Sequence, residues 1–212
     1  PDGWRGPATD GMDLDGVSEA LISGCSVNNN DDGIVFKGGF GAWADDPEKF
    51  PNNRPNRNII IEDCHFGEQG HACVGAGSEC YDVRNVIVRR VRVDAGAWNL
   101  LRLKIRPDTP QDYRGIFVED AGGTVGNVLQ IDTFPRNHLY YEFGDRKDIP
   151  KSFVSGIRFK NIKMTCRKQF YFWEDPEYKG KLEMSEPVFE NMELTLSSKF
   201  KSTHASRKEP ES

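Results

Sequence analysis

The sequence predicts an all-β protein folded as a right-handed parallel β-helix, and three observations carry that prediction. Short Val- and Ile-rich runs with polar alternation, typical of strands, recur along the 212 residues. Gly (21) and Pro (12) are common between these runs, which favours turns over helices. The runs return roughly every 20–30 residues without helical stretches between them, and this spacing indicates a solenoid of stacked coils.

The individual repeats follow one pattern, a polar turn leading into an alternating apolar strand. Clear copies lie at 20–27, 58–66, 85–93 and 156–164, and weaker copies lie at 115–120 and 188–194. Equivalent residues of successive coils stack about 4.8 Å apart in a β-helix. We therefore expect an inward ladder made of Ile22, Ile61, Val88 and Phe159.

Other repeat folds fit less well. Leucine-rich repeats need a Leu-x-x-Leu-x-Leu rhythm, which is missing. A β-sandwich stays as the alternative, but its hairpins require closer strand spacing and Asn-Gly or Asp-Gly connections.

Residues 1–198 are expected to form one β-helix domain, and the polar, charged segment 199–212 a disordered tail. The interval between the first two clear repeats is one loop too long, so residues 38–55 should project from the solenoid. The chain opens on a candidate catalytic coil without a cap. Because a solenoid end needs a cap, we expect further N-terminal coils in a longer protein.

Composition narrows the possible partners. A net charge of -5 argues against nucleic acid, and no run of 18 apolar residues is present to span a membrane as a helix. The five cysteines lack metal-binding spacing, so we interpret them as buried free thiols, with a Cys64–Cys80 disulfide as the alternative. We expect no cofactor, no metal, and a monomer.

Charged residues recur at coil spacing on what should be one outer face. Asp10 lies 21 residues before Asp31, so their strands should stack directly, and a chain bend near Gly33 would let Asp31 and Asp32 both face outward. His71 should follow one coil later, once the projecting loop is discounted. In the next coil come Arg102 and Lys104, two apart and therefore on one face. Packing alone gives no reason for this set.

These residues resemble the four motifs of glycoside hydrolase family 28, the polygalacturonases, which have the pectin-lyase-like β-helix fold. The family pattern is Asn-Thr-Asp, Asp-Asp, Gly-His-Gly and Arg-Ile-Lys, one motif per coil. The matching segments read Ala8-Thr9-Asp10, Asp31-Asp32, Gly70-His71-Ala72 and Arg102-Leu103-Lys104. The match covers roughly residues 7–132, and the four motifs together are specific.

The resemblance implies an inverting hydrolase without metal that cleaves galacturonic-acid-containing, pectic polysaccharide of the plant cell wall, outside the cell or in the periplasm. It implies that Asp31 is the general acid and that Asp10 and Asp32 hold and deprotonate water. His71 would set the protonation of this cluster. Arg102 and Lys104 would face the carboxylate of an acidic sugar.

Departures from the family pattern concern the substrate. Ala8 replaces Asn and removes an amide, Ala72 replaces Gly and should add a methyl beside the cleft, and Leu103 replaces Ile at an inward position. Rhamnogalacturonan or another plant polysaccharide is therefore an open alternative. A non-catalytic carbohydrate-binding β-helix, or a β-helix lyase or epimerase, is a further alternative.

Aromatic residues add two expectations. Trp43 and Trp98 could stack on sugars or equally pin loops, and the cluster 170–173 should plug the late coils. The long loop 38–55 could close one end of the cleft and favour exo action.

Overall fold

The computed structural model describes residues 8–67, 70–134 and 141–198. The expected tail, 199–212, lies outside these residues. Within them, strands alternate with turns and one short 3-10 helix, η1 (Pro176–Tyr178). No helix of the described residues is long and apolar enough to cross a membrane.

Fifteen strands of the described chain belong to one hydrogen-bonded sheet in which every pairing is parallel. Their bounds are β1 (Met12–Asp15), β2 (Ser18–Ser23), β3 (Ser26–Val27), β4 (Ile34–Lys37), β5 (Asn56–Glu62), β6 (His65–Phe66), β7 (Ala72–Ala76), β8 (Asp82–Arg89), β9 (Arg92–Ile105), β10 (Asp112–Thr133), β11 (Ser152–Ser155), β12 (Arg158–Cys166), β13 (Lys168–Trp173), β14 (Leu182–Met184) and β15 (Val188–Leu196).

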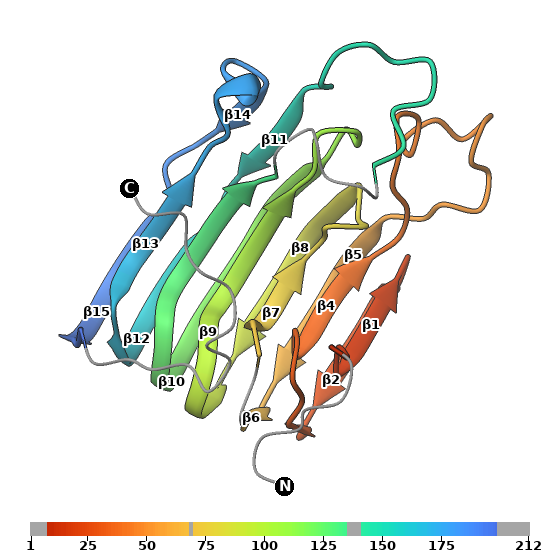
Figure 1. The fold of residues 1–212 in the computed structure, drawn as a ribbon. Helices are drawn as coiled ribbons and strands as arrows, with labels where there is room; N and C mark the ends of the chain where they lie inside the picture. Colours follow the sequence, from red (N-terminus) through yellow and green to blue (C-terminus); the bar gives the residue numbers. More distant parts are fainter. Residues whose placement is uncertain (1–7, 68–69, 135–140, 199–212) are drawn as a thin grey trace, which may run out of the picture.

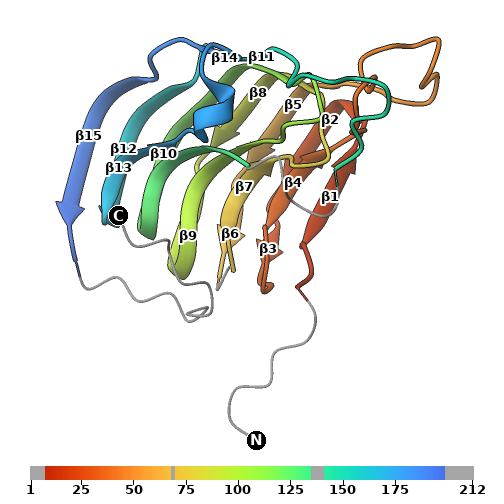
Figure 2. The ribbon, with the colours of Figure 1, turned by 45° about the horizontal axis from the view of Figure 1, so that its top comes forward.

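The strands wind into coils that follow the chain from β1 to β15, as Figure 1 shows. One face stacks β2, β5, β8, the first half of β10, β12 and β15. The next face stacks β1, β4, β7, the second halves of β9 and β10, and β13. Figure 2 shows how the sheet curls through these faces. The right-handed parallel β-helix is therefore confirmed.

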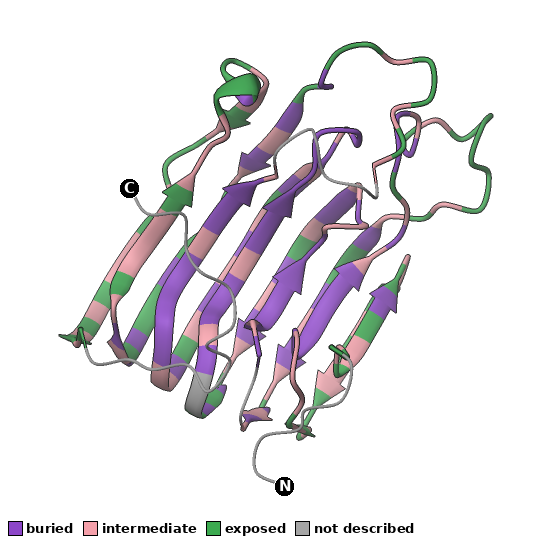
Figure 3. Ribbon diagram, viewed as in Figure 1, coloured by how far each residue is buried: buried purple, intermediate pink, exposed green. Residues whose placement is uncertain are grey.

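The inward ladder also has the expected members. Ile22 pairs with Ile61, Ile61 with Val88, and the ladder continues through Val118 to Phe159. Ile61 and Phe159 have no exposed surface, and the rings of Phe159 and Phe189 stack with centroids 5.2 Å apart. In Figure 3 the middle strands are the most buried, and the outermost strands are more exposed.

The corners of the coil carry ladders of residues in the left-handed backbone region. Asp63, Arg90, Asp120, Asn161 and Asn191 occupy one corner at φ between 51° and 55°. The Asn161 amide donates to Asp120 Oδ1 at 2.9 Å and accepts from Asn191 Nδ2 at 2.7 Å. Side chains thus stabilise a conformation that non-glycine residues otherwise disfavour.

The structure tests three expectations about single segments. The five cysteines are free. The loop 38–55 projects from the coil, as the orange segment of Figure 1 shows. The cluster 170–173 covers the core only in part, since Phe170 packs against it whereas Phe172 is 40% exposed.

Candidate active site

Asp10, Asp31, Asp32 and His71 come from three successive coils, on the segments just before β1, β4 and β7. The register of β1 with β4 pairs Met12 with Ile34. Asp10 is therefore level with Asp32, one residue away from the expected stacking on Asp31. The reason is that the first coil takes 22 residues, one more than the spacing from Asp10 to Asp31.

Asparagines hold the entrance to the first coil. Asn30 Oδ1 accepts from the backbone N–H of Thr9 at 2.8 Å, and Asn29 Nδ2 donates to the Thr9 carbonyl at 2.9 Å. Asn29 Nδ2 also donates to the Asp32 carbonyl at 2.7 Å, which fixes the bend before β4. The asparagine run thus orients the backbone that carries Asp10, Asp31 and Asp32.

Two glycines make room for the carboxylates. A Cβ on Gly70 would lie 1.8 Å from the Asn30 carbonyl oxygen, so only glycine permits the close approach of these coils. A Cβ on Gly75 would lie 3.3 Å from Asp32 Oδ2, so the absence of a side chain at Gly75 leaves room for the Asp32 carboxylate. Ala72 is fully buried, which means that its methyl does not line a cleft as expected.

Asp31 and His71 form a close pair. His71 Nδ1 lies 2.5 Å from Asp31 Oδ1, with the side chains 31% and 19% exposed. Burial raises the pKa of Asp31, but the hydrogen bond and charge of His71, with the charge of Lys104, outweigh burial. The pKa of Asp31 therefore lies below its ordinary value.

Asp32 is fully buried and has both oxygens occupied. Oδ1 accepts from the Ala72 N–H at 3.0 Å, and Oδ2 lies 2.5 Å from Lys104 Nζ. A buried carboxylate needs such partners to remain ionised. Lys104 therefore binds Asp32 directly in this structure.

Asp10 has the opposite electrostatic surroundings to Asp31. Its Oδ1 accepts from the Asp32 N–H at 3.1 Å, and its Oδ2 lies 3.2 Å from Lys37 Nζ. Burial raises the pKa of Asp10, the Lys37 charge lowers it, and the charges of Asp32 and Asp31 raise it, with a raised pKa as the result.

Arg102 is paired through two hydrogen bonds with Asp132. Nε lies 3.0 Å from Oδ1 and Nη2 lies 2.8 Å from Oδ2, and the side chains are 16% and 10% exposed. Leu103 between the two cations has no exposed surface, as expected for an inward residue. Asp132 comes 28 residues after Lys104, a coil spacing by which the sequence could have revealed it.

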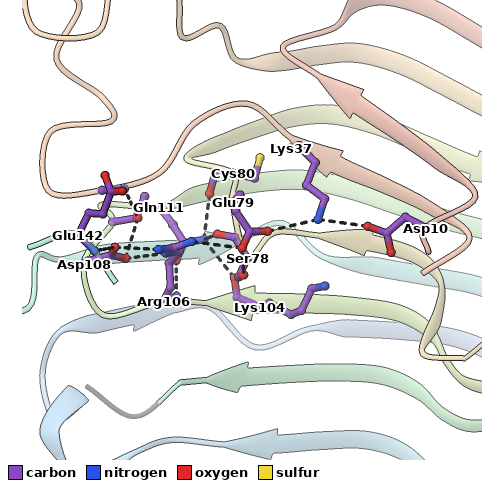
Figure 4. A network of polar contacts seen from close by, with 12 residues as sticks. Asp10, Lys37, Ser78, Glu79, Cys80, Lys104, Arg106, Asp108, Gln111 and Glu142 are labelled. Atoms are coloured by element: carbon purple, nitrogen blue, oxygen red, sulfur yellow. Dashed lines mark hydrogen bonds and ion pairs between the residues drawn. The ribbon is translucent and has the colours of Figure 1, made fainter. Parts of the chain in front are cut away.

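A chain of ion pairs continues from Asp10 (Figure 4). Lys37 bridges Asp10 and Glu79, and Glu79 Oε1 lies 3.3 Å from Arg106 Nη1. Arg106 is 2% exposed and binds both oxygens of Asp108 at 2.6 and 2.8 Å. The sequence pattern assigned none of these four residues a role in the site, and the burial of Arg106 differs from the solvated strand face that its neighbours suggest.

The loop 38–55 is attached to the same network. Gly41 N donates to Thr109 Oγ1 at 2.8 Å, next to Asp108. Trp43 Nε1 donates to Asp145 Oδ1 at 2.7 Å, and the Trp43 ring lies under Lys49 at 3.4 Å and Arg146 at 4.5 Å. These contacts favour loop pinning as the role of Trp43. The Arg167 guanidinium lies 5.7 Å from the Trp98 ring.

Ligand atoms of Asp31, Asp32 and His71 all lie within 4.8 Å of one another, a spacing that a metal ion could bridge. The atoms are engaged with other partners, however. His71 Nδ1 contacts Asp31 Oδ1, and Asp32 contacts Lys104 and the Ala72 N–H. An ammonium 2.5 Å from Asp32 opposes a second cation there, so this donor set fits proton transfer better than metal binding.

Comparison with known proteins finds no matching family model and no matching curated protein. Among solved structures, a polygalacturonase from Erwinia carotovora ssp. carotovora is similar, with a TM-score of 0.50 and 18% sequence identity. The match covers 89% of this chain and 46% of that chain, so this chain spans less than half of that protein. This likeness shows a shared pectin-lyase-like β-helix fold.

Proposed function

We propose that this protein is a glycoside hydrolase that cleaves galacturonic-acid-containing, pectic polysaccharide with an aspartate acid/base pair and inversion at the anomeric carbon. The observation that carries the proposal is the gathering of Asp10, Asp31, Asp32 and His71 from three coils, with Asp10 bonded to the Asp32 N–H and His71 to Asp31. Glycosidic hydrolysis needs two carboxyl groups in different protonation states.

Asp31 acts with His71 as the acid. Burial raises the pKa of the Asp31 carboxyl, but the hydrogen bond and charge of His71 outweigh it. In this proposal the pair enters the reaction with one proton shared between Nδ1 and Oδ1. That proton moves toward the glycosidic oxygen as the leaving group departs. The pair, rather than Asp31 alone, then determines the alkaline limb of the pH–rate profile.

Asp10 acts as the base, together with Asp32, which helps to hold the water. A raised pKa makes the Asp10 carboxylate a stronger proton acceptor than an ordinary aspartate, provided that it remains ionised at the working pH. Asp32 is fixed by Lys104 and by the Ala72 N–H, which suits it to orient rather than to exchange protons.

Arg102 and Lys104 bind the acidic sugar in this proposal. Asp132 occupies the Nε–Nη2 edge of Arg102, so the proposal assigns the substrate carboxylate to Nη1. We propose in addition that the protein acts outside the cell or in the periplasm, where such a polymer would be met, and that it is a monomer.

The test follows new reducing ends from polygalacturonate and from rhamnogalacturonan, without added metal, for wild type and Asp31→Asn. The matched control is Asp94→Asn. Asp94 forms an exposed His–Asp pair, with its Oδ2 2.9 Å from His65 Nε2, and this pair lies outside the site. Release that is lost in Asp31→Asn and kept in Asp94→Asn supports the proposal and identifies the polymer. A folded wild type that releases nothing from either polymer instead favours a non-catalytic carbohydrate-binding β-helix.

The two carboxyl roles are separated with an aryl glycoside substrate. A variant that lacks the acid regains activity when the leaving group needs no proton, whereas a variant that lacks the base regains activity with azide. We expect the first behaviour for Asp31→Asn and the second for Asp10→Asn, and the reverse pattern would exchange the roles. The NMR signal of the first-formed anomer checks inversion.

A further inference from the structure

Lys37, the last residue of β4, lies between two carboxylates from different coils. Its Nζ is 3.2 Å from Asp10 Oδ2 and 3.3 Å from Glu79 Oε2, and its side chain is 20% exposed. Burial lowers the pKa of Lys37, but Glu79 and Asp10 outweigh it and raise the pKa to about 12. Lys37 is therefore a fixed positive charge beside Asp10 (Figure 4).

Glu79 is itself held from several sides. Ser78 Oγ donates to Oε1 at 2.8 Å, and Arg106 Nη1 lies 3.3 Å from the same oxygen. Arg106 in turn is locked by Asp108 and is almost fully buried. Arg106 holds the Oε1 atom of Glu79, so the Oε2 atom stays directed at Lys37. The Lys37 ammonium is thereby held in one position.

The other charges around Asp10 are negative. Asp31 and Asp32, from the segment before β4, both raise the pKa of Asp10, in the same direction as burial. His71 and Lys104 contact those other carboxylates, Asp31 and Asp32, rather than Asp10. Lys37 is thus the positive charge in direct contact with the Asp10 carboxylate among the described residues.

We propose that Lys37 is a positioning residue that keeps Asp10 ionised and oriented to accept a proton from water, and that Glu79 holds Lys37 in that place. The inference rests on the proposed hydrolysis and adds to it the pair of residues that keeps the proposed base, Asp10, ionised and oriented. Without a cation at this point, burial and two neighbouring carboxylates would favour the protonated Asp10, which cannot accept a proton.

The test records pH profiles of kcat/KM for wild type, Lys37→Met, Lys37→Arg and Glu79→Gln. Removal of the positive charge raises the pKa of Asp10, so the acid limb of Lys37→Met should move to higher pH by about one unit. At pH values on that limb, kcat/KM should then be about tenfold lower than in wild type. Lys37→Arg should restore the limb. Glu79→Gln weakens the contact that holds Lys37 beside Asp10, so its limb should move in the same direction as that of Lys37→Met, but by less.

The matched control is Lys163→Met, which removes the lysine of an exposed pair with Glu193 at 2.9 Å and should leave the profile unchanged. An active wild type whose acid limb stays in place in Lys37→Met overturns the inference alone. A limb that stays in place or moves to lower pH in Glu79→Gln overturns the role given to Glu79. A wild type that cleaves no polymer overturns the proposed function, and the inference with it.

Discussion

Asp10 and Asp31 have opposite pKa shifts although they belong to neighbouring coils. Burial and two carboxylates dominate around Asp10, whereas His71 outweighs burial at Asp31. Ionised Asp10 therefore costs stability in the folded protein, while ionised Asp31 contributes to it. Such a cost is common where a site is built for chemistry rather than for stability.

At neutral pH we expect Asp10→Asn to raise the free energy of unfolding and Asp31→Asn to lower it. The folded pKa of Asp31 lies below its ordinary value of 3.8, so its contribution is present above that value and is lost as the pH falls through the folded pKa. Urea unfolding between about pH 3 and pH 7 checks both signs. Equal destabilisation by the two variants across this range would contradict the assignment.

Lys104→Met leaves the fully buried Asp32 without its cation, and we expect a loss of roughly 3–5 kcal/mol in unfolding free energy. The matched control is Lys151→Met, which breaks a pair with Glu183 whose side chains are 61% and 53% exposed. That change should cost below about 1 kcal/mol. Chemical denaturation of both variants gives the comparison, and similar losses would refute the role of burial.

Gly70→Ala places a Cβ 1.8 Å from the Asn30 carbonyl oxygen, so the coil that carries His71 must move. We expect a loss of about 1–3 kcal/mol and a weakened contact between His71 and Asp31. Gly122→Ala is the control, because its Cβ would meet only the Lys163 carbonyl, at 3.5 Å. Urea titration should leave the control close to wild type.

At the scale of the element, the corner ladders define where each coil turns. Asn161 adopts φ 55° and links Asp120 to Asn191 through its side chain. The repeat pattern of the sequence does not reveal that these amides bond to one another along the stack. That bonding depends on the exact register of three coils.

Substitutions at Asn161 separate the contribution of the side-chain hydrogen bonds to stability from the cost of the left-handed backbone. Asn161→Ala loses the ladder and keeps a Cβ in the left-handed region, so we expect a loss of about 1–3 kcal/mol. Asn161→Gly loses the ladder but removes the backbone strain, so its loss should be smaller. Thermal unfolding of both variants decides, and an equal loss would assign the whole effect to the ladder.

Strand positions and inward ladders could be predicted from the sequence because alternation and coil spacing are local properties. The faces of Arg102 and Leu103 followed for the same reason. Coil spacing could also have placed Asp132 level with Lys104. Its pairing with Arg102, and that of Lys37 with Glu79, could not be predicted, because long side chains reach diagonally across coils and choose among several partners. The one-residue error at Asp10 arose because a coil length cannot be fixed without its turn geometry.

At the scale of the molecule, the loop 38–55 and the segment 141–146 are joined beside the site. Trp43 makes several of the contacts there: its Nε1 donates to Asp145, and its ring lies against Lys49 and Arg146. We expect Trp43→Ala to increase proteolytic cleavage within 38–55 while the unfolding of the coil stays nearly unchanged. Limited proteolysis followed by mass spectrometry locates the cuts, and cleavage spread along the strands would instead indicate a loosened core.

The spacing between stacked residues along the site-bearing face is irregular in the chain although the stacking is regular in space. Met12, Ile34, Val74, Leu101, Leu129 and Phe170 follow one another by pairing, at chain distances of 22, 40, 27, 28 and 41 residues. All variation in length is absorbed by the connections. Such an architecture separates two kinds of evolutionary change: exchanging a connection can reshape the surface beside the site, while Asp10, Asp31 and Asp32 keep their mutual positions. Under the proposed function, grafting of foreign loops between Gly38 and Pro55 should therefore change the choice of polymer without displacing these carboxylates.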